Sequence, residues 1–197
     1  MEVAVLEYNA GNVRSVLYAL ERLGVRAEVT GSPERLASAA KVIFPGVGEA
    51  SSTMRYLREH GLDGVIRSLE KPVLGICLGL QLLCSHSMEN DTECLGVFPE
   101  PVLRFDADRA AGIKVPHMGW NAVSATRGPL FEGIPEGTNF YFVHSFYAQI
   151  GDDTCGVCNH GIDFSAAVSS RNFSAVQFHP EKSGPAGERL LSNFLKL

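Results

Sequence analysis

The chain has no long run of basic residues, and its formal net charge is −5 over 197 residues. Proteins that bind nucleic acids gather Lys and Arg side chains into a basic patch or stripe. The chain also lacks an apolar stretch of the roughly 20 residues that a membrane-spanning helix needs. We therefore expect neither a nucleic acid nor a membrane among its main partners.

The first residues, MEVAVL, carry none of the basic residues that begin a secretory signal peptide. They are typical of a first buried strand instead, so we expect a cytoplasmic protein. Internal repeats, low-complexity tracts and long linkers are absent as well. A chain of this length that is 45% hydrophobic is expected to form a single domain, residues 1–197.

The five cysteines are an odd number, and their scattered positions do not suggest a disulfide framework. Cys155 and Cys158 form a Cys-x-x-Cys pair, which could be a redox pair or, with His160, half of a zinc site. A strand over residues 154–159 would instead point the two thiols to opposite faces. Because a second cysteine pair is missing, a metal or redox role is the less favoured alternative. Cys84 is expected to be a core residue.

Apolar runs and helix-like segments alternate along the first half of the chain. Strands are expected at residues 2–7, 25–29, 41–45 and 72–76, and helices at 12–23, 33–39, 49–59 and 78–86. This alternation predicts an α/β fold with a central, mostly parallel sheet flanked by helices. The second half is richer in strands, at about 97–105, 138–143, 154–159, 164–169 and 173–178, and a closing helix is expected from Pro185.

Residues 72–81 read PVLGICLGLQ, a short apolar strand followed by a helix that begins after Cys77. Gly75 and Gly79 flank the cysteine at the spacing of a strand-to-helix nucleophile elbow, with Cys in place of Ser. The glycines allow a sharp turn and close packing, and a helix N-terminus favours a thiolate. The alternative is a small buried cysteine in a tight turn, and this motif alone does not decide between them.

Residues 176–183 read VQFHPEKS, in which His179 ends a strand-like run. Pro180 biases His179 toward extended backbone, and two extended residues would bring the side chains of His179 and Glu181 to the same side. Glu181 would then orient the imidazole, as a carboxylate does in a nucleophile–base–orienter triad. The alternative is a surface His-Pro turn beside an exposed Glu, which the Cys77 elbow makes less favoured.

Residues 42–48 read VIFPGVG, an apolar strand that runs into a glycine-rich turn. Such a turn can present backbone N–H groups to a developing oxyanion. A phosphate-cradling or purely structural turn is the alternative, although Pro-Gly-x-Gly matches neither the P-loop nor the dinucleotide fingerprint. Ligands of open α/β sheets bind beyond the carboxyl ends of the strands, and both this turn and the elbow fall there.

In their order and spacing, these three motifs resemble those of the class I, triad-type glutamine amidotransferases, and the resemblance covers nearly the whole chain. Three further stretches are residues 8–12 (YNAGN), 116–121 (PHMGWN) and 141–146 (YFVHSF). With them the chain resembles the family of glutaminase subunits of imidazole glycerol phosphate synthase, a two-subunit enzyme of histidine biosynthesis. The resemblance implies the flavodoxin-like amidotransferase fold.

The resemblance also implies a mechanism for hydrolysing the side-chain amide of L-glutamine. Cys77 would attack the amide carbon, His179 would move the protons, and Glu181 would hold the imidazole. The oxyanion would be met by backbone N–H groups near Val47 and Leu78. No metal ion and no organic cofactor is implied.

Substrate-binding residues are carried over from the family at matching positions. They are Gly46, Gly48, Gln81, Glu89, Ser145 and Phe146. Gln81 would bind the α-amino or carboxylate end of glutamine, because position i+4 faces the same side of the helix as Cys77. Glu89 would help to hold the ammonium group, Ser145 and Phe146 would offer backbone groups, and the glycines would allow close approach. The alternatives are an exposed helix Gln, a loop Glu and ordinary strand-end residues.

Synthesis with ammonia needs a protected path, because ammonia released into water becomes ammonium and loses its nucleophilicity. The chain shows no obvious second active site, so the resemblance implies a partner, the (β/α)8-barrel cyclase subunit. Its substrate would be a phosphoribulosyl-formimino carboxamide ribonucleotide, and its products imidazole glycerol phosphate and an aminoimidazole carboxamide ribotide. Residues expected at the subunit face are Asn12, Trp120, Asn121 and Tyr141. A core aromatic is the alternative for Trp120.

Three rival functions use parts of the same pattern. The glutaminase of another synthase, such as the one that feeds pyridoxal phosphate synthesis, would use the same triad. A stand-alone γ-glutamyl hydrolase or cysteine peptidase would need no partner for activity. A non-catalytic binding module on the same fold is disfavoured by the intact set of Cys77, His179 and Glu181.

Overall fold

The computed structural model describes residues 2–8, 13–106 and 113–197. The first half contains β1 (Val3–Leu6), α1 (Val13–Arg22), β2 (Ala27–Thr30), α2 (Pro33–Ser38), β3 (Lys41–Phe44), α3 (Ala50–Glu59), α4 (Leu62–Ser68), β4 (Val73–Ile76) and α5 (Leu78–Leu83). The second half contains β5 (His86–Ser87), β6 (Thr92–Glu93), β7 (Val102–Arg104), β8 (His117–Val123), the 3₁₀ turn η1 (Pro129–Phe131), β9 (Thr138–His144), β10 (Phe146–Ala148), β11 (Thr154–Asn159), β12 (Asp163–Ser170), β13 (Phe173–Val176), the 3₁₀ turn η2 (Pro180–Lys182) and α6 (Gly184–Lys196). Within these ranges no helix is both long and apolar enough to cross a membrane.

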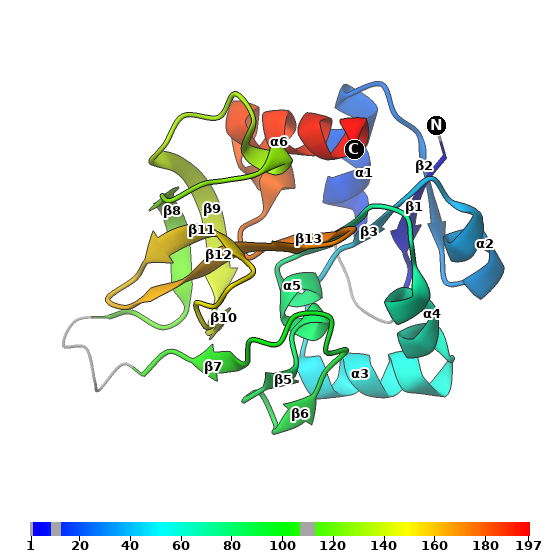
Figure 1. Cartoon of the computed structure of the whole chain (residues 1–197), viewed down its shortest axis with the longest axis horizontal. Coiled ribbons are helices and arrows are strands. Elements are labelled where there is room, and N and C mark those ends of the chain that lie inside the picture. The colour runs from blue at the N-terminus through cyan, green and yellow to red at the C-terminus, as the bar shows by residue number, and fades with distance from the viewer. Residues whose placement is uncertain (1, 9–12, 107–112) are drawn as a thin grey trace.

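The central sheet is parallel in its first part and antiparallel toward the other edge. Strands β2, β1, β3, β4 and β13 lie side by side in that order, and each neighbouring pair is parallel. The sheet then continues through β12, β10 and β7 with antiparallel pairing, and Figure 1 shows it crossing the molecule. The expected α/β fold, with a mostly parallel centre and extra strands from the second half, is confirmed.

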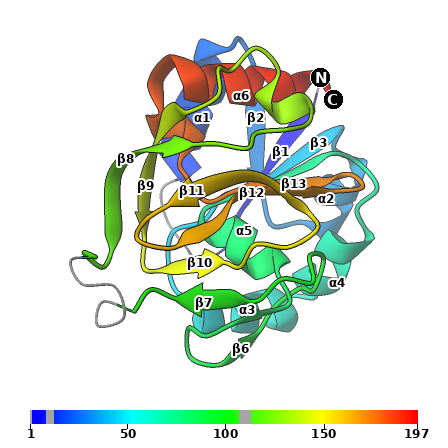
Figure 2. The same ribbon diagram turned by 60° about the vertical axis from the view of Figure 1, so that its left-hand side comes forward.

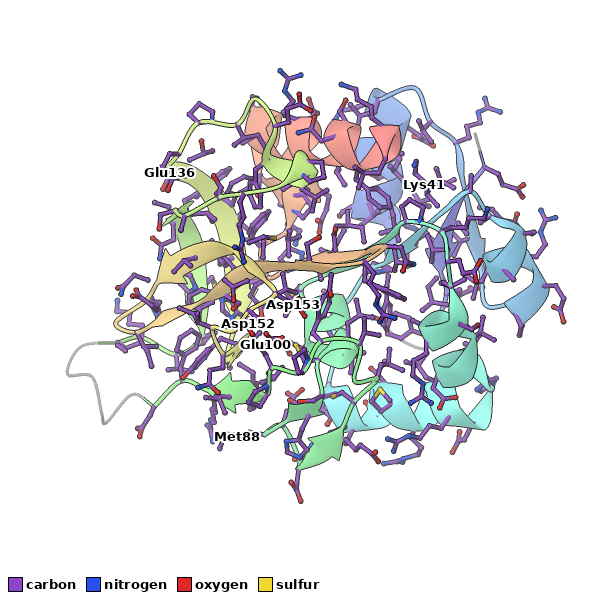
Figure 3. The ribbon with its side chains drawn as sticks, in the orientation of Figure 1. Lys41, Met88, Glu100, Glu136, Asp152 and Asp153 are labelled. Atoms are coloured by element: carbon purple, nitrogen blue, oxygen red, sulfur yellow. The ribbon has the colours of Figure 1, made fainter. Side chains whose placement is uncertain are left out.

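Helices cover both faces of the sheet, and the strand residues alternate between them. α1 and α6 lie on one face, and α3, α4 and α5 lie on the other (Figure 1). In β1, Val3 and Val5 pack with the first group, whereas Ala4 and Leu6 pack with the second. At the start of β3, Lys41 lies beside α6 (Figure 3), with Nζ 5.9 Å from the centre of the Phe194 ring. The buried sheet therefore has two apolar layers, as the uninterrupted apolar strands predict.

The carboxyl ends of the parallel strands meet at one edge of the sheet. β3 leads directly into Pro45 and Gly46, β4 leads into Cys77, and β13 leads through Gln177 to His179. The three motifs that the sequence analysis singled out are far apart in the chain. The parallel topology brings them to the same edge, where open α/β sheets bind their ligands.

Strands β8 and β9 form a separate two-stranded antiparallel sheet, which we call the β8–β9 hairpin. The hairpin lies beside β11, at the end of the molecule opposite α2 (Figures 1 and 2). Its outer face carries the exposed side chains of Met118 and Trp120. Exposed large apolar side chains that lie close together are typical of interaction surfaces.

Several expected boundaries are wrong. The strand expected over 97–105 pairs only at Val102–Arg104, because Pro99 and Pro101 have no N–H group to donate to a sheet. The helix expected over 78–86 ends at Leu83, since Cys84 takes extended backbone with φ −66° and ψ 178°.

Helix α4 and strands β8 and β10 are not among the expected elements. A strand usually turns its apolar side chains toward the core and its polar side chains toward solvent. In β8 this pattern is reversed, because the large apolar side chains of Met118 and Trp120 face solvent.

The strand expected over residues 154–159 is β11, and Cys155 and Cys158 are both buried in it. Both cysteines belong to the large apolar cluster that also contains residues of α1 and α6. The pairing of β11 with β12 shifts register between Thr154 and Val157. The first shift, before Gly156, is cancelled by a second shift between Gly156 and Val157, so the pairing returns to its original register. All five cysteines are free thiols, and Cys84 is fully buried as expected.

Candidate active site

Cys77 occupies a strained position between β4 and α5. Its φ of 53° and ψ of −106° are values that non-glycine residues rarely adopt. Strain of this kind persists only where the surrounding structure enforces it, and it concentrates at functional sites. The elbow that the Gly-x-Cys-x-Gly spacing predicts is therefore present, with the thiol buried at the edge of the sheet.

Three glycines allow the elbow to pack against neighbouring backbone. A Cβ atom on Gly79 would lie 2.1 Å from the Phe44 carbonyl oxygen, and one on Gly46 would lie 2.5 Å from Cβ of Leu78. A Cβ on Gly75 would lie 2.8 Å from a methyl carbon of Leu83. These distances are too short for any side chain, so the glycines fix how closely β3, β4 and α5 approach each other.

We expect Gly79→Ala to lower the free energy of unfolding by about 1–3 kcal/mol, because the new methyl group overpacks against the Phe44 carbonyl. Urea denaturation followed by circular dichroism measures this change. The matched control is Gly64→Ala in α4, where no described atom lies within 4 Å of the added Cβ. That variant is expected to gain about 0.5–1 kcal/mol from helix propensity. Equal stability of the two variants would contradict the packing argument.

His179 and Glu181 lie next to the elbow and form a close pair. Nδ1 of His179 donates to Oε1 of Glu181 at 2.8 Å, and the two side chains are only 3% and 4% exposed. The backbone differs from the expectation, because Glu181 belongs to the 3₁₀ turn η2 and only His179 is extended. The turn nevertheless brings the carboxylate to the imidazole, as predicted.

The hydrogen bond to Glu181 decides which nitrogen of His179 faces the thiol. Since Nδ1 donates to the carboxylate, Nε2 is free to interact with Cys77. Burial by itself lowers the pKa of His179, but the interactions with Cys77 and Glu181 outweigh it and raise the pKa from 6.5 to about 10. The imidazole therefore readily holds the proton that Cys77 gives up, which is what a thiolate–imidazolium pair requires.

The turn after β3 lies directly against the elbow. The backbone N–H of Leu78 donates to the Gly46 carbonyl at 3.4 Å. Pro45, Gly46, Val47 and His179 also line a cavity of about 10 Å³, which is about the volume of one water probe. The two groups expected at the oxyanion, near Val47 and Leu78, are thus adjacent, but the Leu78 donor is already occupied by the Gly46 carbonyl.

Tyr8, two residues beyond the end of β1, supports this turn. Its hydroxyl group donates to the Pro45 carbonyl, and its ring packs edge-on against Phe44 with centroids 5.6 Å apart. Burial, with a smaller effect from Cys77, raises the pKa of Tyr8 far above its ordinary value. Tyr8 therefore remains a neutral donor at any physiological pH and fixes the start of the turn.

Gln177 is a residue that the sequence analysis did not single out. It is fully buried, and its Nε2 donates to Sγ of Cys77 at 3.6 Å. Its Oε1 accepts a hydrogen bond from Nε2 of Gln81 at 3.1 Å. One signal in the sequence could have indicated this residue. It is a single glutamine between two apolar residues at the end of a buried strand, where a polar side chain needs hydrogen-bond partners.

The other expected substrate-binding residues lie around the same edge. Gln81 is buried rather than exposed, and its Nε2 also donates to the Phe146 carbonyl at 3.0 Å. Glu89 accepts from the Ala50 N–H at 2.8 Å, at the start of α3, and burial raises its pKa. Ser145 accepts from the Phe105 N–H through its carbonyl, and Gly48 is exposed with φ of 138°.

The residues expected at a subunit face do not all point the same way. Trp120 is 58% exposed and packs edge-on against Tyr141, with centroids 6.1 Å apart. Asn121 turns inward instead, donating to the Asn159 carbonyl and to Nε2 of His117. Asn12 lies outside the described residues.

The backbone of β9 touches the candidate site directly. The carbonyl of Tyr141 accepts from the His179 N–H at 2.9 Å, and the Tyr141 N–H donates to Oγ of Ser183 at 3.0 Å. The Val143 carbonyl lies 3.9 Å from Sγ of Cys77. The hairpin therefore connects an exposed apolar face with both His179 and Cys77.

Within the described residues, no group of three or more His, Cys, Asp and Glu side chains could hold a metal ion. His160 donates to the Lys114 carbonyl and stacks on His117. Burial raises the pKa of Cys155 and of Cys158 to about 12. Their thiols are thus protonated and apolar in character, in agreement with a packing role.

The chain also matches known proteins along its length. The family model described as Glutamine amidotransferase class-I matches residues 4–197. The chain is 54% identical over 197 residues to a protein of Bacteroides fragilis (strain ATCC 25285) named imidazole glycerol phosphate synthase subunit HisH, with 100% of both chains covered. It belongs to the HisH family of class I glutamine amidotransferases. The protein named HisH 1 in Vibrio vulnificus (strain YJ016) is 45% identical over 203 residues, covering 100% of this chain and 98% of the relative.

Solved structures with lower identity share the fold of this HisH family member. A structure described as a glutamine amidotransferase aligns with a TM-score of 0.75 at 24% identity, covering 98% of this chain and 97% of its own. A structure described as PurLQS from Thermotoga maritima aligns with a TM-score of 0.70 at 19% identity, covering 99% of this chain and 97% of its own. The expected class I glutamine amidotransferase fold is thus confirmed.

Proposed function

We propose that this HisH family member hydrolyses glutamine to glutamate and ammonia as the glutaminase subunit of imidazole glycerol phosphate synthase in histidine biosynthesis. The observation that carries the proposal is the placement of His179 between the Cys77 thiol and the Glu181 carboxylate. A nucleophile, a base and a group that orients the base are the minimal set for covalent attack on an amide. The strained elbow at Cys77 supports the same assignment.

The reaction begins with transfer of the Cys77 proton to Nε2 of His179. The thiolate attacks the amide carbon of glutamine, and the imidazolium then gives its proton to the leaving ammonia. Glu181 keeps the proton on Nδ1, so that Nε2 faces the thiol throughout. Water, activated by the neutral imidazole, cleaves the glutamyl thioester and releases glutamate.

The oxyanion turn must change before this chemistry is efficient. The Gly46 carbonyl and the Val47 N–H belong to one peptide unit, and the carbonyl now accepts from the Leu78 N–H. Rotation of this peptide would remove the carbonyl and point the Val47 N–H toward the same space. Two donors would then face the oxyanion, and the loss of either donor would raise the activation barrier by about 2.7–4 kcal/mol. We propose that binding of the partner subunit triggers this rotation.

The ammonia is delivered to a (β/α)8-barrel cyclase subunit in a heterodimer. There it is used on a phosphoribulosyl-formimino carboxamide ribonucleotide to form imidazole glycerol phosphate and an aminoimidazole carboxamide ribotide. Trp120, Tyr141 and, outside the described residues, Asn12 belong to the proposed contact face. The proposal places the enzyme in the cytoplasm, where five free thiols are stable.

Glutamine hydrolysis should be measured for the chain alone, with the cyclase subunit, and with the cyclase plus its ribonucleotide ligand. We expect weak activity alone and stimulation of roughly 5- to 150-fold in the full complex, the usual range of allosteric coupling. Robust hydrolysis without the partner would favour a stand-alone hydrolase. Stimulation by a pyridoxal phosphate synthase subunit but not by the cyclase would favour the other synthase.

A pair of variants tests whether the hairpin receives the partner. Trp120→Ala should raise the cyclase concentration for half-maximal stimulation by roughly 30-fold, since buried aromatic anchors at interfaces contribute about 2 kcal/mol or more. Ile150→Ala is the matched control, because Ile150 is also exposed (45%) but lies outside the hairpin. Equal concentration dependence for both variants would place the contact face elsewhere.

A further inference from the structure

Two buried histidines lie at the open end of the β8–β9 hairpin, and the mechanism above does not use them. His117 opens β8 and His144 closes β9, and they are directly opposite each other in the pairing of the two strands. Their exposed fractions are 4% and 6%. Phe105, Phe142 and Phe164 surround the pair. Polar groups in such a setting need every hydrogen bond that they can make.

The hydrogen bonds fix the tautomer of each ring. Nδ1 of His144 lies 2.7 Å from the Phe146 carbonyl, which can only accept, so Nδ1 carries the proton. Nε2 of His144 is then the acceptor for Nδ1 of His117 at 2.9 Å. Nε2 of His117 in turn accepts from Nδ2 of Asn121 at 3.2 Å. One arrangement of protons therefore satisfies all three contacts, with both rings neutral.

The surroundings keep both rings neutral. Burial, aided by the nearby His160, lowers the pKa of His117 to about 4. Burial also lowers the pKa of His144 to about 3, although the hydrogen bond to the Phe146 carbonyl opposes the shift. At neutral pH both histidines thus act as fixed donors and acceptors rather than as proton carriers.

The chain of hydrogen bonds continues from the Phe146 carbonyl to the nucleophile. This carbonyl accepts a second hydrogen bond, from Nε2 of Gln81. The other proton of the same nitrogen goes to Gln177, whose own amide donates to Sγ of Cys77. A continuous series of hydrogen bonds, through side chains and the Phe146 carbonyl, therefore links Asn121 on the hairpin with the thiol.

We propose that His144, held in its tautomer by His117, is a positioning residue that fixes the Phe146 carbonyl for the glutaminase site. The inference rests on the proposed function, because it takes glutamine as the substrate and uses the glutamine-binding role that the family resemblance implies for the backbone of Ser145 and Phe146. His144 touches neither substrate nor thiol. It acts by holding the segment to which Gln81 is bonded, and so sets the affinity for glutamine.

The test compares His144→Asn with His144→Leu in the complex with the cyclase subunit. An asparagine amide nitrogen occupies nearly the position of Nδ1 and keeps the donor to the Phe146 carbonyl, whereas leucine removes it. We expect His144→Leu to raise the KM for glutamine by about tenfold, the usual effect of a lost buried hydrogen bond, with a smaller change in kcat. His144→Asn should stay within about threefold of the wild type. Similar KM values for the two variants would overturn the proposal.

Controls separate this inference from assembly and from the proposed function. Ammonia-dependent synthesis should be equal for all variants, which shows that the complex forms. His160→Leu is the matched variant, because His160 stacks on His117 but gives no hydrogen bond to the chain of side chains described above, and its KM should be unchanged. If the wild-type complex does not hydrolyse glutamine, the proposed function fails rather than this inference.

A measurement without activity or substitution remains if the leucine variant does not fold. Long-range ¹H–¹⁵N NMR spectra of the wild-type chain distinguish the neutral Nδ1–H and Nε2–H tautomers from the imidazolium. Both His117 and His144 should show the neutral Nδ1–H form at pH 7. An Nε2–H tautomer or a charged ring at either position would overturn the proposal.

Discussion

Replacing Cys77 by alanine is expected to lower glutamine-dependent synthesis by the assembled enzyme by at least about 10³-fold, the usual scale for loss of a nucleophile. Without the sulfur, no thioester can form, and the remaining groups only bind the amide. Synthesis from added ammonium salt should persist, because the cyclase does not need Cys77. Both rates can be followed in one spectrophotometric assay of the cyclase product.

Cys84→Ala is the matched control for this experiment. Cys84 follows the same short helix and is fully buried, and burial raises its pKa well above the ordinary value. Its thiol is therefore unreactive, and glutamine-dependent synthesis should stay within about twofold of the wild type. Substantial glutaminase activity in Cys77→Ala, or its loss in Cys84→Ala, would show that the nucleophile is assigned wrongly.

Glu181→Gln should lower kcat for glutamine hydrolysis by about 10³–10⁴-fold, because an amide can stabilise the wrong tautomer of His179. With the proton on Nε2, His179 can no longer accept the proton of Cys77. Glu188→Gln is a suitable control, since Glu188 pairs with Arg22 on the exposed surface of α6. Its activity should not change measurably.

The pH dependence of the residual activity gives a second measure of Glu181. The alkaline limb of kcat/KM reports loss of the imidazolium that protonates ammonia, with an apparent pKa that belongs to the Cys77–His179 pair. For the wild type this limb should lie near pH 10, as the pKa of His179 indicates. Because the bond to Glu181 raises that pKa, its removal should move the limb to lower pH. An unchanged limb would contradict the orienting role.

The sequence predicts the parallel half of the fold well, because its strands are buried on both faces. β1, β3 and β4 are short apolar runs bounded by turns, and such runs have few other possible structures. The hairpin strand β8 is missed for a physical reason. Its large apolar side chains, Met118 and Trp120, face solvent, so its hydrophobic pattern does not follow the core of the chain.

The candidate site likewise contains some residues that the sequence predicts and others that it misses. The sequence predicts Cys77, His179 and Glu181 because each lies in a local motif with an unusual backbone conformation. These motifs are the strained elbow and the turn that begins with a proline. The sequence does not predict Gln177 or the pair of His117 and His144, because their roles depend on contacts between residues that are far apart in the chain. The orientation of the Gly46 peptide is a backbone state, which residue identities do not report.

The β8–β9 hairpin contacts the candidate site through its main chain and faces solvent through its side chains. Its contacts with His179 and with the Cys77 sulfur use the carbonyls of Tyr141 and Val143, which any amino acid supplies. Its solvent face is formed by replaceable side chains, chiefly Met118 and Trp120. If the proposed assembly holds, substitutions on this outer face could therefore change which partner the chain accepts while the backbone contacts with His179 and Cys77 stay the same. Under the same proposal, two such chains with different outer faces could each assemble only with their own partner in one cell.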